Sequence, residues 1–420
     1  MKNVLSFILV LLTLQNAISQ TLSPILKNHN GINYERLTRI DTILKNYENK
    51  NWLVGAVVII VKDNQVVYYK GSGYATLLNK KPMQADAIFR IMSQTKAITS
   101  LAIMQLFEKG KIGLDQKISD FIPEFKNPKV IKSFNALDSS YTSMAAKREI
   151  TFRDLLTHTS GIDYPAIGTD TMQAVYAKNN IPSGLGYFDE NLLSKMKALA
   201  TLPVLHNPGE RFTYGLNTDL LGCLIEIISG ESLETYYNKN IFEPLGMMDT
   251  YFNVPATKAD RLATVYTEDK NHKIIEWSPT FRNINPDYPL VPKTYFSGGA
   301  GLSSTAFDYS IFLQMLLNGG RYNDKQILGR RTVELMLSPQ LPDNFLGDDN
   351  FCLGFNLTTK KSANLNMLNE NSFSWGGYYG TTYWADPKEK LICLIMTQHT
   401  PNSHNDYVDK ITNVIYSSLK

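Results

Sequence analysis

Phe89-Arg-Ile-Met-Ser-Gln-Thr-Lys96 opens a long apolar stretch, and within it Ser93 stands three residues before Lys96. Residues three apart on a helix share one face, with Cβ atoms about 5–6 Å apart, so the lysine amine can reach the serine hydroxyl. Such a base activates a serine as a nucleophile if burial or another cation lowers the pKa of the lysine. The stretch therefore predicts an activated serine, although an N-cap serine followed by a solvated lysine would show the same spacing.

The residues after Lys96 are apolar on more than one face up to Phe107, which predicts a buried helix ending near Lys109 and Gly110. A serine on the first turn of such a helix lies among free backbone N–H groups, at the positive end of the helix dipole. Both features favour a developing oxyanion. An acyl-transfer site at this helix would need further partners from other parts of the chain.

Residues 1–19 have the pattern of a cleavable secretory signal peptide, with an early lysine, a short apolar run and small residues at its end. No later segment reaches the roughly 18 consecutive apolar residues of a membrane span. We therefore expect a periplasmic or secreted protein with no stable membrane insertion after the signal is removed.

The composition is that of an ordinary globular protein, with 43% hydrophobic and 19% charged residues. The 42 basic and 39 acidic residues nearly cancel and form no basic stripe, so we expect no nucleic-acid partner. The three cysteines, Cys223, Cys352 and Cys393, lie in apolar segments and predict buried free thiols. The six histidines show no zinc-binding spacing, so we expect neither a metal nor another cofactor.

Strand-forming segments gather at the two ends of the chain, and the middle is dominated by helices and polar loops. We therefore predict an α/β fold, an α+β sandwich, in which one antiparallel sheet is built from both termini and flanked by helices. Residues 20–112 and 296–420 would form the α/β subdomain, and 113–295 a mostly helical inserted subdomain. The predicted strands are 54–61 and 66–70, which form a hairpin, and 373–378, 380–386 and 391–397, which form a meander.

Three places in the second and last thirds of the chain carry candidate residues. His158 lies in a capped turn that closes on Gly161, where a histidine is more often a structural hydrogen bonder than a member of a catalytic triad. Tyr214 stands just before a predicted buried helix that stops at Gly230. The glycines of 296–302 predict close backbone packing or a turn, because they lack the phosphate-loop pattern. A helix is predicted over 306–317, and a closing amphipathic helix over 405–419.

With these pieces placed, the chain resembles the serine β-lactamase and penicillin-binding-protein superfamily, nearest to class C β-lactamases and family VIII carboxylesterases. The resemblance covers about Trp52 to His399 and implies a β-lactamase-like fold. Its motifs, in order, are Ser93-Gln-Thr-Lys96 as the nucleophile motif, Leu155-Leu-Thr-His-Thr-Ser-Gly161 as a stretch common among these relatives, Tyr214 as the catalytic tyrosine, and Trp375-Gly376-Gly377 where lactamases carry Lys-Thr-Gly.

Two departures from the lactamase pattern bear on the site. The lactamases have Tyr-x-Asn, whereas Tyr214-Gly-Leu-Asn217 is one residue longer, which leaves open whether Asn217 contacts the substrate or Lys96. Trp375 replaces the lysine of Lys-Thr-Gly, which removes a cation available to a β-lactam carboxylate and leaves an aromatic wall. Family VIII esterases often have Trp-Gly-Gly at this strand.

The resemblance implies that Ser93 attacks an acyl carbonyl while Lys96 and Tyr214 share the proton transfer, and that water then cleaves the acyl-enzyme. The implied oxyanion donors are the Ser93 N–H and a backbone N–H of Gly377 or Tyr378. The oxyanion- and substrate-binding candidates are Trp375, Gly376, Gly377, Tyr378 and Asn217.

The leading hypothesis is an exported serine hydrolase that cleaves carboxylic esters through an acyl-enzyme. One alternative keeps the nucleophile but is a β-lactamase, or a D-amino-acid peptidase or amidase acting on cell-wall-type peptides. Another is a non-catalytic penicillin-binding-like module, although such a module has no need to keep Ser93, Lys96 and Tyr214 together. The expected partner is a small-molecule ester, amide or peptide substrate.

Overall fold

The computed structural model describes residues 22–23, 29–184, 186, 190–281, 284–343 and 345–420. The predicted signal peptide, residues 1–19, lies outside the described residues. No helix in the described part of the chain combines the length and the apolar character of a membrane span. The three cysteines, Cys223, Cys352 and Cys393, are free and buried, as predicted.

An eight-stranded antiparallel sheet forms the centre of the fold, in the order β12-β13-β14-β15-β16-β1-β2-β3. Strand β1 lies beside both its hairpin partner β2 and the late strand β16, with Val57 opposite Met396 and Lys62 opposite Leu391. The two ends of the chain therefore build one sheet, as predicted. Its strands are β1 (Gly55–Lys62), β2 (Gln65–Thr76), β3 (Lys81–Pro82), β12 (Asn350–Phe351), β13 (Asn356–Leu357), β14 (Phe373–Gly376), β15 (Thr382–Asp386) and β16 (Leu391–Met396).

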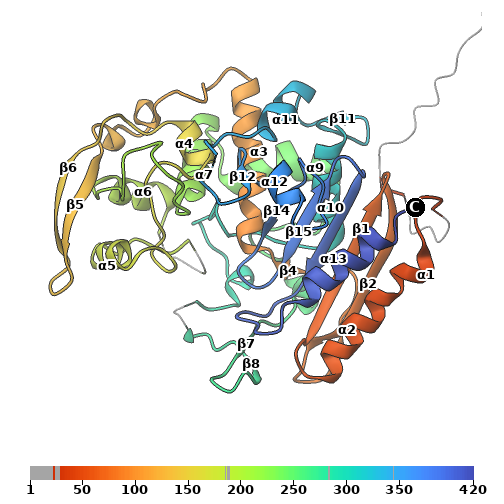
Figure 1. Ribbon diagram of the computed structural model, residues 1–420. Helices are drawn as coiled ribbons and strands as arrows, with labels where there is room; N and C mark the ends of the chain where they lie inside the picture. The colour runs from red at the N-terminus through yellow and green to blue at the C-terminus, as the bar shows by residue number, and fades with distance from the viewer. Residues whose placement is uncertain (1–21, 24–28, 185, 187–189, 282–283, 344) are drawn as a thin grey trace, which may run out of the picture.

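Helices cover both faces of this sheet, and for that reason β1 is an unbroken apolar run. Its residues Ala56, Val58 and Ile60 pack in a cluster with helices α2 and α13, whereas Val57 and Ile59 face the main core with α3 and α10. Figure 1 shows α2 and α13 together on one face of the sheet. The helices are α1 (Tyr34–Leu37), α2 (Arg39–Asn49), α3 (Thr95–Glu108), α4 (Phe152–Leu156), α5 (Asp170–Lys178), α6 (Leu192–Ala200), α7 (Asn217–Ser229), α8 (Leu233–Tyr237), α9 (Glu243–Leu245), α10 (Ala306–Leu317), α11 (Arg330–Met336), α12 (Lys360–Ala363) and α13 (Tyr407–Ser417).

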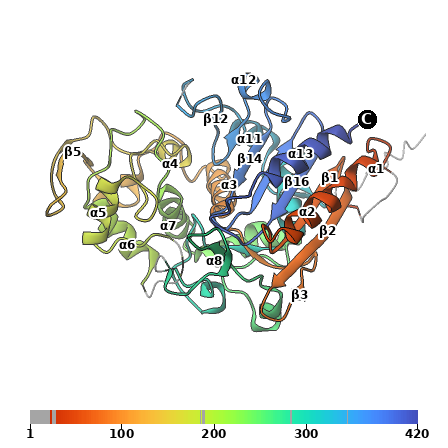
Figure 2. The same cartoon turned by 60° about the horizontal axis from the view of Figure 1, so that its bottom comes forward.

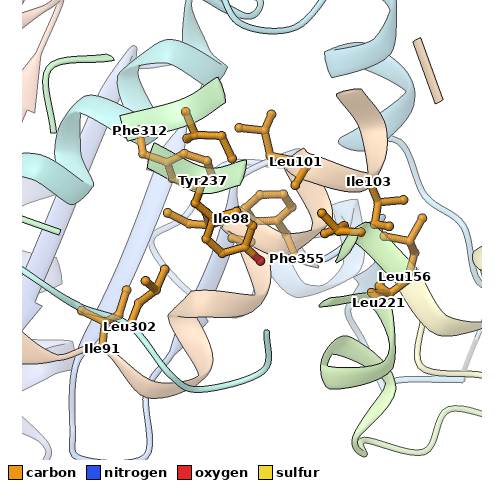
Figure 3. Close-up of a cluster of buried hydrophobic side chains, with 14 of the residues drawn as sticks. Ile91, Ile98, Leu101, Ile103, Leu156, Leu221, Tyr237, Leu302, Phe312 and Phe355 are labelled. Atoms are coloured by element: carbon orange, nitrogen blue, oxygen red, sulfur yellow. The ribbon is translucent and has the colours of Figure 1, made fainter. Parts of the chain in front are cut away.

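Helix α3 is the buried helix that the apolar stretch predicts. Every residue of it from Thr95 to Leu106 is buried. Figures 1 and 2 place α3 between the sheet and the group of helices α4–α7. Figure 3 shows its side chains between Phe312 of α10 on one side and Leu156 and Leu221 on the other. The start of α3 therefore lies where the sheet and the inserted helices meet.

Residues 113–295 contain more strand than the sequence indicates. Besides helices they carry two small hairpins, β5 (Lys129–Asn135) with β6 (Ser140–Ala145), and β7 (Tyr266–Glu268) with β8 (Ile274–Glu276). The first hairpin is largely exposed, so it lacks the buried apolar alternation by which a strand is recognised. The division of the chain into two subdomains stays a prediction. One more pair, β4 (Phe89–Arg90) with β9 (Ser303–Ser304), leads into the Ser93 turn, and β10 (Arg321–Tyr322) pairs with β11 (Lys325–Gln326).

Candidate active site

A single 3-10 turn, Met92–Gln94, presents Ser93 at the start of α3. Met92 has a φ of 49°, in the left-handed region that a methionine seldom adopts. Its side chain is fully buried in a cluster with Trp277 and Tyr288, and this packing holds the turn in its conformation. As a result Ser93, which is only partly buried, lines a cavity beside the sheet.

Lys96 is almost completely buried, with 2% of its surface exposed. Its Nζ donates to Ser93 Oγ at 3.2 Å, to the Tyr164 hydroxyl at 2.9 Å and to the Gly299 carbonyl at 2.8 Å. Nζ therefore has a hydrogen-bond partner in each of three directions. Lys96 therefore links the nucleophile to two segments that lie far away in the sequence.

Tyr164 and Ile167 are the two cavity-lining residues that the sequence does not predict, and Tyr164 is the one that contacts Lys96. It follows the Leu155–Gly161 stretch and is buried, and burial raises its pKa well above the usual range. Its phenol therefore stays protonated at neutral pH. The one available signal is its place three residues after Gly161, which closes the turn that carries His158.

The aromatic ring of Tyr214 contacts Lys96. The Lys96 Nζ lies 4.7 Å from the centroid of the Tyr214 ring, which is a cation–π contact. The same ring lies 5.4 Å from that of Tyr164 and 5.5 Å from that of Trp375. The structure thus brings together Ser93, Lys96, Tyr214 and Trp375, which the sequence names from three separate motifs.

Gly299 can reach Lys96 because it has no side chain. A Cβ at this position would lie 2.4 Å from Asp219 Oδ2 and 3.2 Å from the Tyr164 hydroxyl. A Cβ on the neighbouring Gly298 would lie 2.5 Å from the Thr218 carbonyl, so the predicted close backbone packing of the 296–302 glycines is confirmed there. Asp219 is fully buried; burial raises its pKa to about 6, against a hydrogen bond from Ser297 and the charge of Lys96, which lower it.

The edge of the sheet closes the other side of the cavity. Trp375 and Gly376 end strand β14, and Gly377 begins the turn to β15. The Gly377 N–H donates to the Thr381 carbonyl at 2.7 Å, so that amide is engaged within the turn. A Cβ on Gly377 would lie 2.4 Å from the Ile91 carbonyl, which explains the need for glycine here. Of the two predicted oxyanion positions, Tyr378 lines the cavity.

The cavity has a volume of about 330 Å³. None of the described residues that line it carries a charged side chain; they are Ser93, Tyr164, Ile167, Tyr214, Trp375, Gly376 and Tyr378. Its polar side-chain groups are hydroxyls and an indole. In the described part of the chain, no three His, Cys, Asp or Glu side chains are grouped so that they could hold a metal ion.

Asn217 does not line this cavity. It is fully buried as the first residue of α7, where its Nδ2 donates to His158 Nδ1 at 2.9 Å and its Oδ1 accepts from Ser160 Oγ. The amide of Asn217, whose contact with substrate or Lys96 the sequence left open, thus bonds to the 158–160 turn. Burial and the charge of Lys96 lower the pKa of His158 well below its usual value, so its imidazole is neutral.

Comparison with known proteins agrees with this architecture. The model of the Beta-lactamase family matches residues 40–414. An uncharacterized protein of Mycobacterium tuberculosis is 33% identical over 83% of this chain and 87% of its own length. Esterase EstB of Burkholderia gladioli is 26% identical over 86% of this chain and 89% of its own.

A solved structure shares the fold over nearly its whole length. EstCE1, described as a hydrolase with promiscuous acyltransferase activity, superposes with a TM-score of 0.78 at 26% identity, covering 91% of this chain and 99% of its own. This likeness confirms the β-lactamase-like fold that the motifs imply. The chain belongs to the beta-lactamase family of serine hydrolases.

Proposed function

We propose that the protein is an exported esterase that cleaves uncharged carboxylic esters through an acyl-enzyme on Ser93. The observation that carries this proposal is the cavity beside Ser93, whose described lining has aromatic and aliphatic walls and no charged side chain. The similarity to EstB, an esterase, and to EstCE1, a hydrolase, supports this class of reaction. The signal-peptide pattern of residues 1–19 supports export.

The first half of the reaction forms the acyl-enzyme. Ser93 Oγ attacks the ester carbonyl and gives its proton to the base of this cluster, either a neutral Lys96 amine or a Tyr214 phenolate beside a charged Lys96. The oxyanion is held by the Ser93 N–H, at the start of α3, and by the N–H of Tyr378 on the turn after β14. When the carbon–oxygen bond to the alcohol breaks, the alcohol leaves with the proton.

The second half repeats these steps with water in place of the serine. Water loses a proton to the same groups and attacks the acyl carbonyl, and Ser93 Oγ regains a proton as the acid leaves. Lys96 is suited to move this proton because its Nζ lies 3.2 Å from Ser93 Oγ and 2.9 Å from the Tyr164 hydroxyl. Tyr214, whose ring faces Lys96, is the second phenol at the cavity.

Trp375 favours uncharged substrates. A lysine at this edge-strand position would offer a charge-assisted contact to a substrate carboxylate, worth about 1.5–3 kcal/mol. Trp375 offers an apolar face instead, and apolar burial is worth about 25 cal/mol per Å². Neutral esters should therefore be turned over with a higher kcat/KM than anionic penicillins or cephalosporins.

The nucleophile is tested with a fluorophosphonate probe, which labels only an activated serine. We expect the wild type to be labelled and Ser93→Ala to lose both labelling and ester turnover, because loss of a covalent nucleophile costs several orders of magnitude. Circular dichroism of Ser93→Ala serves as the folding control. A variant that keeps more than about a hundredth of the activity would exclude Ser93 as the nucleophile.

The substrate class is tested by steady-state kinetics on a p-nitrophenyl ester, nitrocefin and a D-alanyl peptide, with wild type beside Trp375→Ala. We expect the ester to be the best substrate and the variant to lose ester kcat/KM. Trp52→Ala is a matched control, because Trp52 stacks on His404 and is not among the residues that line the cavity. If the wild type has a higher kcat/KM on nitrocefin or on the peptide than on the ester, the protein is a β-lactamase or a peptidase and not an esterase. If Trp375→Ala lowers only thermal stability, Trp375 merely packs the strand.

A further inference from the structure

The turn that carries Tyr164 to Lys96 is firmly held. Both carboxylate oxygens of Asp163 accept hydrogen bonds within it, Oδ1 from the Tyr164 N–H at 2.8 Å and Oδ2 from the N–H and Oγ1 of Thr169, both at 2.8 Å. The Gly168 N–H donates to the Tyr164 carbonyl at 3.1 Å. A Cβ on Gly168 would lie 2.3 Å from Asp163 Oδ1, so the turn has no spare room. Side chains on this turn therefore keep their positions relative to Lys96.

Ile167 is the second side chain of this turn that lines the cavity. It is 47% exposed, and it shares the cavity wall with Trp375 and Tyr378. The turn thus presents one polar group, the Tyr164 hydroxyl, to the catalytic lysine, and one aliphatic group to the space in front of Ser93. An aliphatic side chain that stays in water next to a nucleophile gains free energy when an apolar part of a substrate covers it.

We propose that Ile167 is a specificity-determining residue that forms, with Trp375 and Tyr378, a subsite for a saturated aliphatic chain of the ester. The proposal rests on the proposed esterase function and deepens it by naming the substrate class: esters with an aliphatic chain of several carbons rather than acetyl or methyl esters. At about 330 Å³ the cavity is at the small end of ligand pockets, so the preferred chain is short to medium in length.

The chain can come from the acyl or from the alcohol side of the ester, and two substrate series separate the two. One is p-nitrophenyl esters from acetate to octanoate, which varies the acyl group. The other is acetate esters of alcohols from ethanol to octanol, followed by acid release. In the wild type we expect kcat/KM to rise with chain length in one series and to level off when the chain outgrows the cavity.

The variants are Ile167→Ala, Ile167→Leu and Leu137→Ala. Removing aliphatic carbons from a hydrophobic site typically changes discrimination by about tenfold, so Ile167→Ala should reduce the ratio of kcat/KM for the best chain to that for the shortest ester by about this factor. Ile167→Leu should restore most of the ratio. Leu137 is 97% exposed on the β5–β6 hairpin and is absent from the cavity lining, so Leu137→Ala should leave the ratio as in the wild type.

Two outcomes would count against the inference, and they are distinguishable. If the wild type cleaves esters but Ile167→Ala and Ile167→Leu have the same chain-length profile as the wild type in both series, Ile167 sets no specificity and the proposed subsite is wrong. If the wild type cleaves no ester of either series and is not labelled by the fluorophosphonate probe, the esterase function itself is wrong, and the inference fails with it.

Discussion

Lys96 contacts two phenols, in different ways. The hydroxyl of Tyr164 accepts from its Nζ at 2.9 Å, whereas Tyr214 offers its ring face at 4.7 Å. The motif spacing could predict Tyr214, because that residue lies in a stretch with its own pattern. Tyr164 could not be predicted, because only the folding of the turn after α4 brings it to a lysine 68 positions earlier.

The first prediction concerns these three side chains. Lys96→Ala, Tyr164→Phe and Tyr214→Phe should each lower kcat/KM by about 10²–10⁴-fold, the usual contribution of general acid–base catalysis. The double variant of Lys96 and Tyr164 should be little worse than the worse single variant, because residues that act as one unit are not additive. Steady-state kinetics on a neutral ester measures this. If Tyr164→Phe lowers kcat/KM only a few-fold, the Tyr164 hydroxyl takes no part in the proton transfer and the residue only packs the site.

At the level of elements, the sequence predicts most helices and strands that pack on the core. The helix predicted over 306–317 is α10, and the helix predicted to stop at Gly230 is α7, whose glycine C-cap has a φ of 74°. These elements are recognisable because each has an apolar pattern and a defined end. The exposed β5–β6 hairpin has no such pattern. Contacts between elements, such as the one that Asn217 makes with the turn after α4, depend on three-dimensional packing that local spacing does not encode.

The second prediction tests that contact between α7 and the 158–160 turn. Asn217→Leu removes the amide that donates to His158 and accepts from the Ser160 hydroxyl. His158 and Ser160 are then left without these partners, and an unsatisfied buried polar group costs about 1–3 kcal/mol. We expect the free energy of unfolding to fall by this amount, while KM of the enzyme that remains folded is nearly unchanged because Asn217 does not line the cavity. Urea unfolding and kinetics measure the two effects. Asn46→Leu, at an exposed position on α2, is the control. A large rise in KM with unchanged stability would show that Asn217 binds the substrate.

Across the whole molecule, the segment that follows β16 pairs with the small β7–β8 hairpin, with His399 beside Tyr266. His399 follows β16 and is buried, with 3% of its surface exposed. The backbone carbonyl of its neighbour Gln398 accepts from the Tyr266 N–H at 2.8 Å. Among the described residues neither ring nitrogen has a hydrogen-bond partner, and the nearest carboxylate, Glu268, is 3.8 Å from Nε2. The sequence predicts β16 but neither the β7–β8 hairpin nor its pairing with the segment after β16. That pairing joins segments that are more than a hundred residues apart.

The last prediction follows from the burial of His399. Burial lowers its pKa to about 4, although Glu268 opposes the shift. The unfolded chain, with a histidine pKa near 6.5, therefore takes up the proton first as the pH falls. Stability that is fully present above about pH 6.5 is thus lost progressively down to about pH 4, by an amount on the order of 3 kcal/mol. Buried Asp219 and Asp308, whose pKa values are raised to about 6, change stability in the opposite direction over part of this range. Only a comparison between variants therefore isolates the histidine.

Urea unfolding of wild type and His399→Gln from pH 7 to pH 4.5 should show a difference in unfolding free energy that shifts in favour of the variant as the pH falls. His272→Gln removes an exposed histidine that contacts the same carboxylate, Glu268, at 3.3 Å, so it separates the loss of a Glu268 partner from the loss of the buried imidazole; it should follow the wild type. A difference between wild type and His399→Gln that stays constant with pH would mean that His399 is protonated as easily in the folded protein as in the unfolded chain.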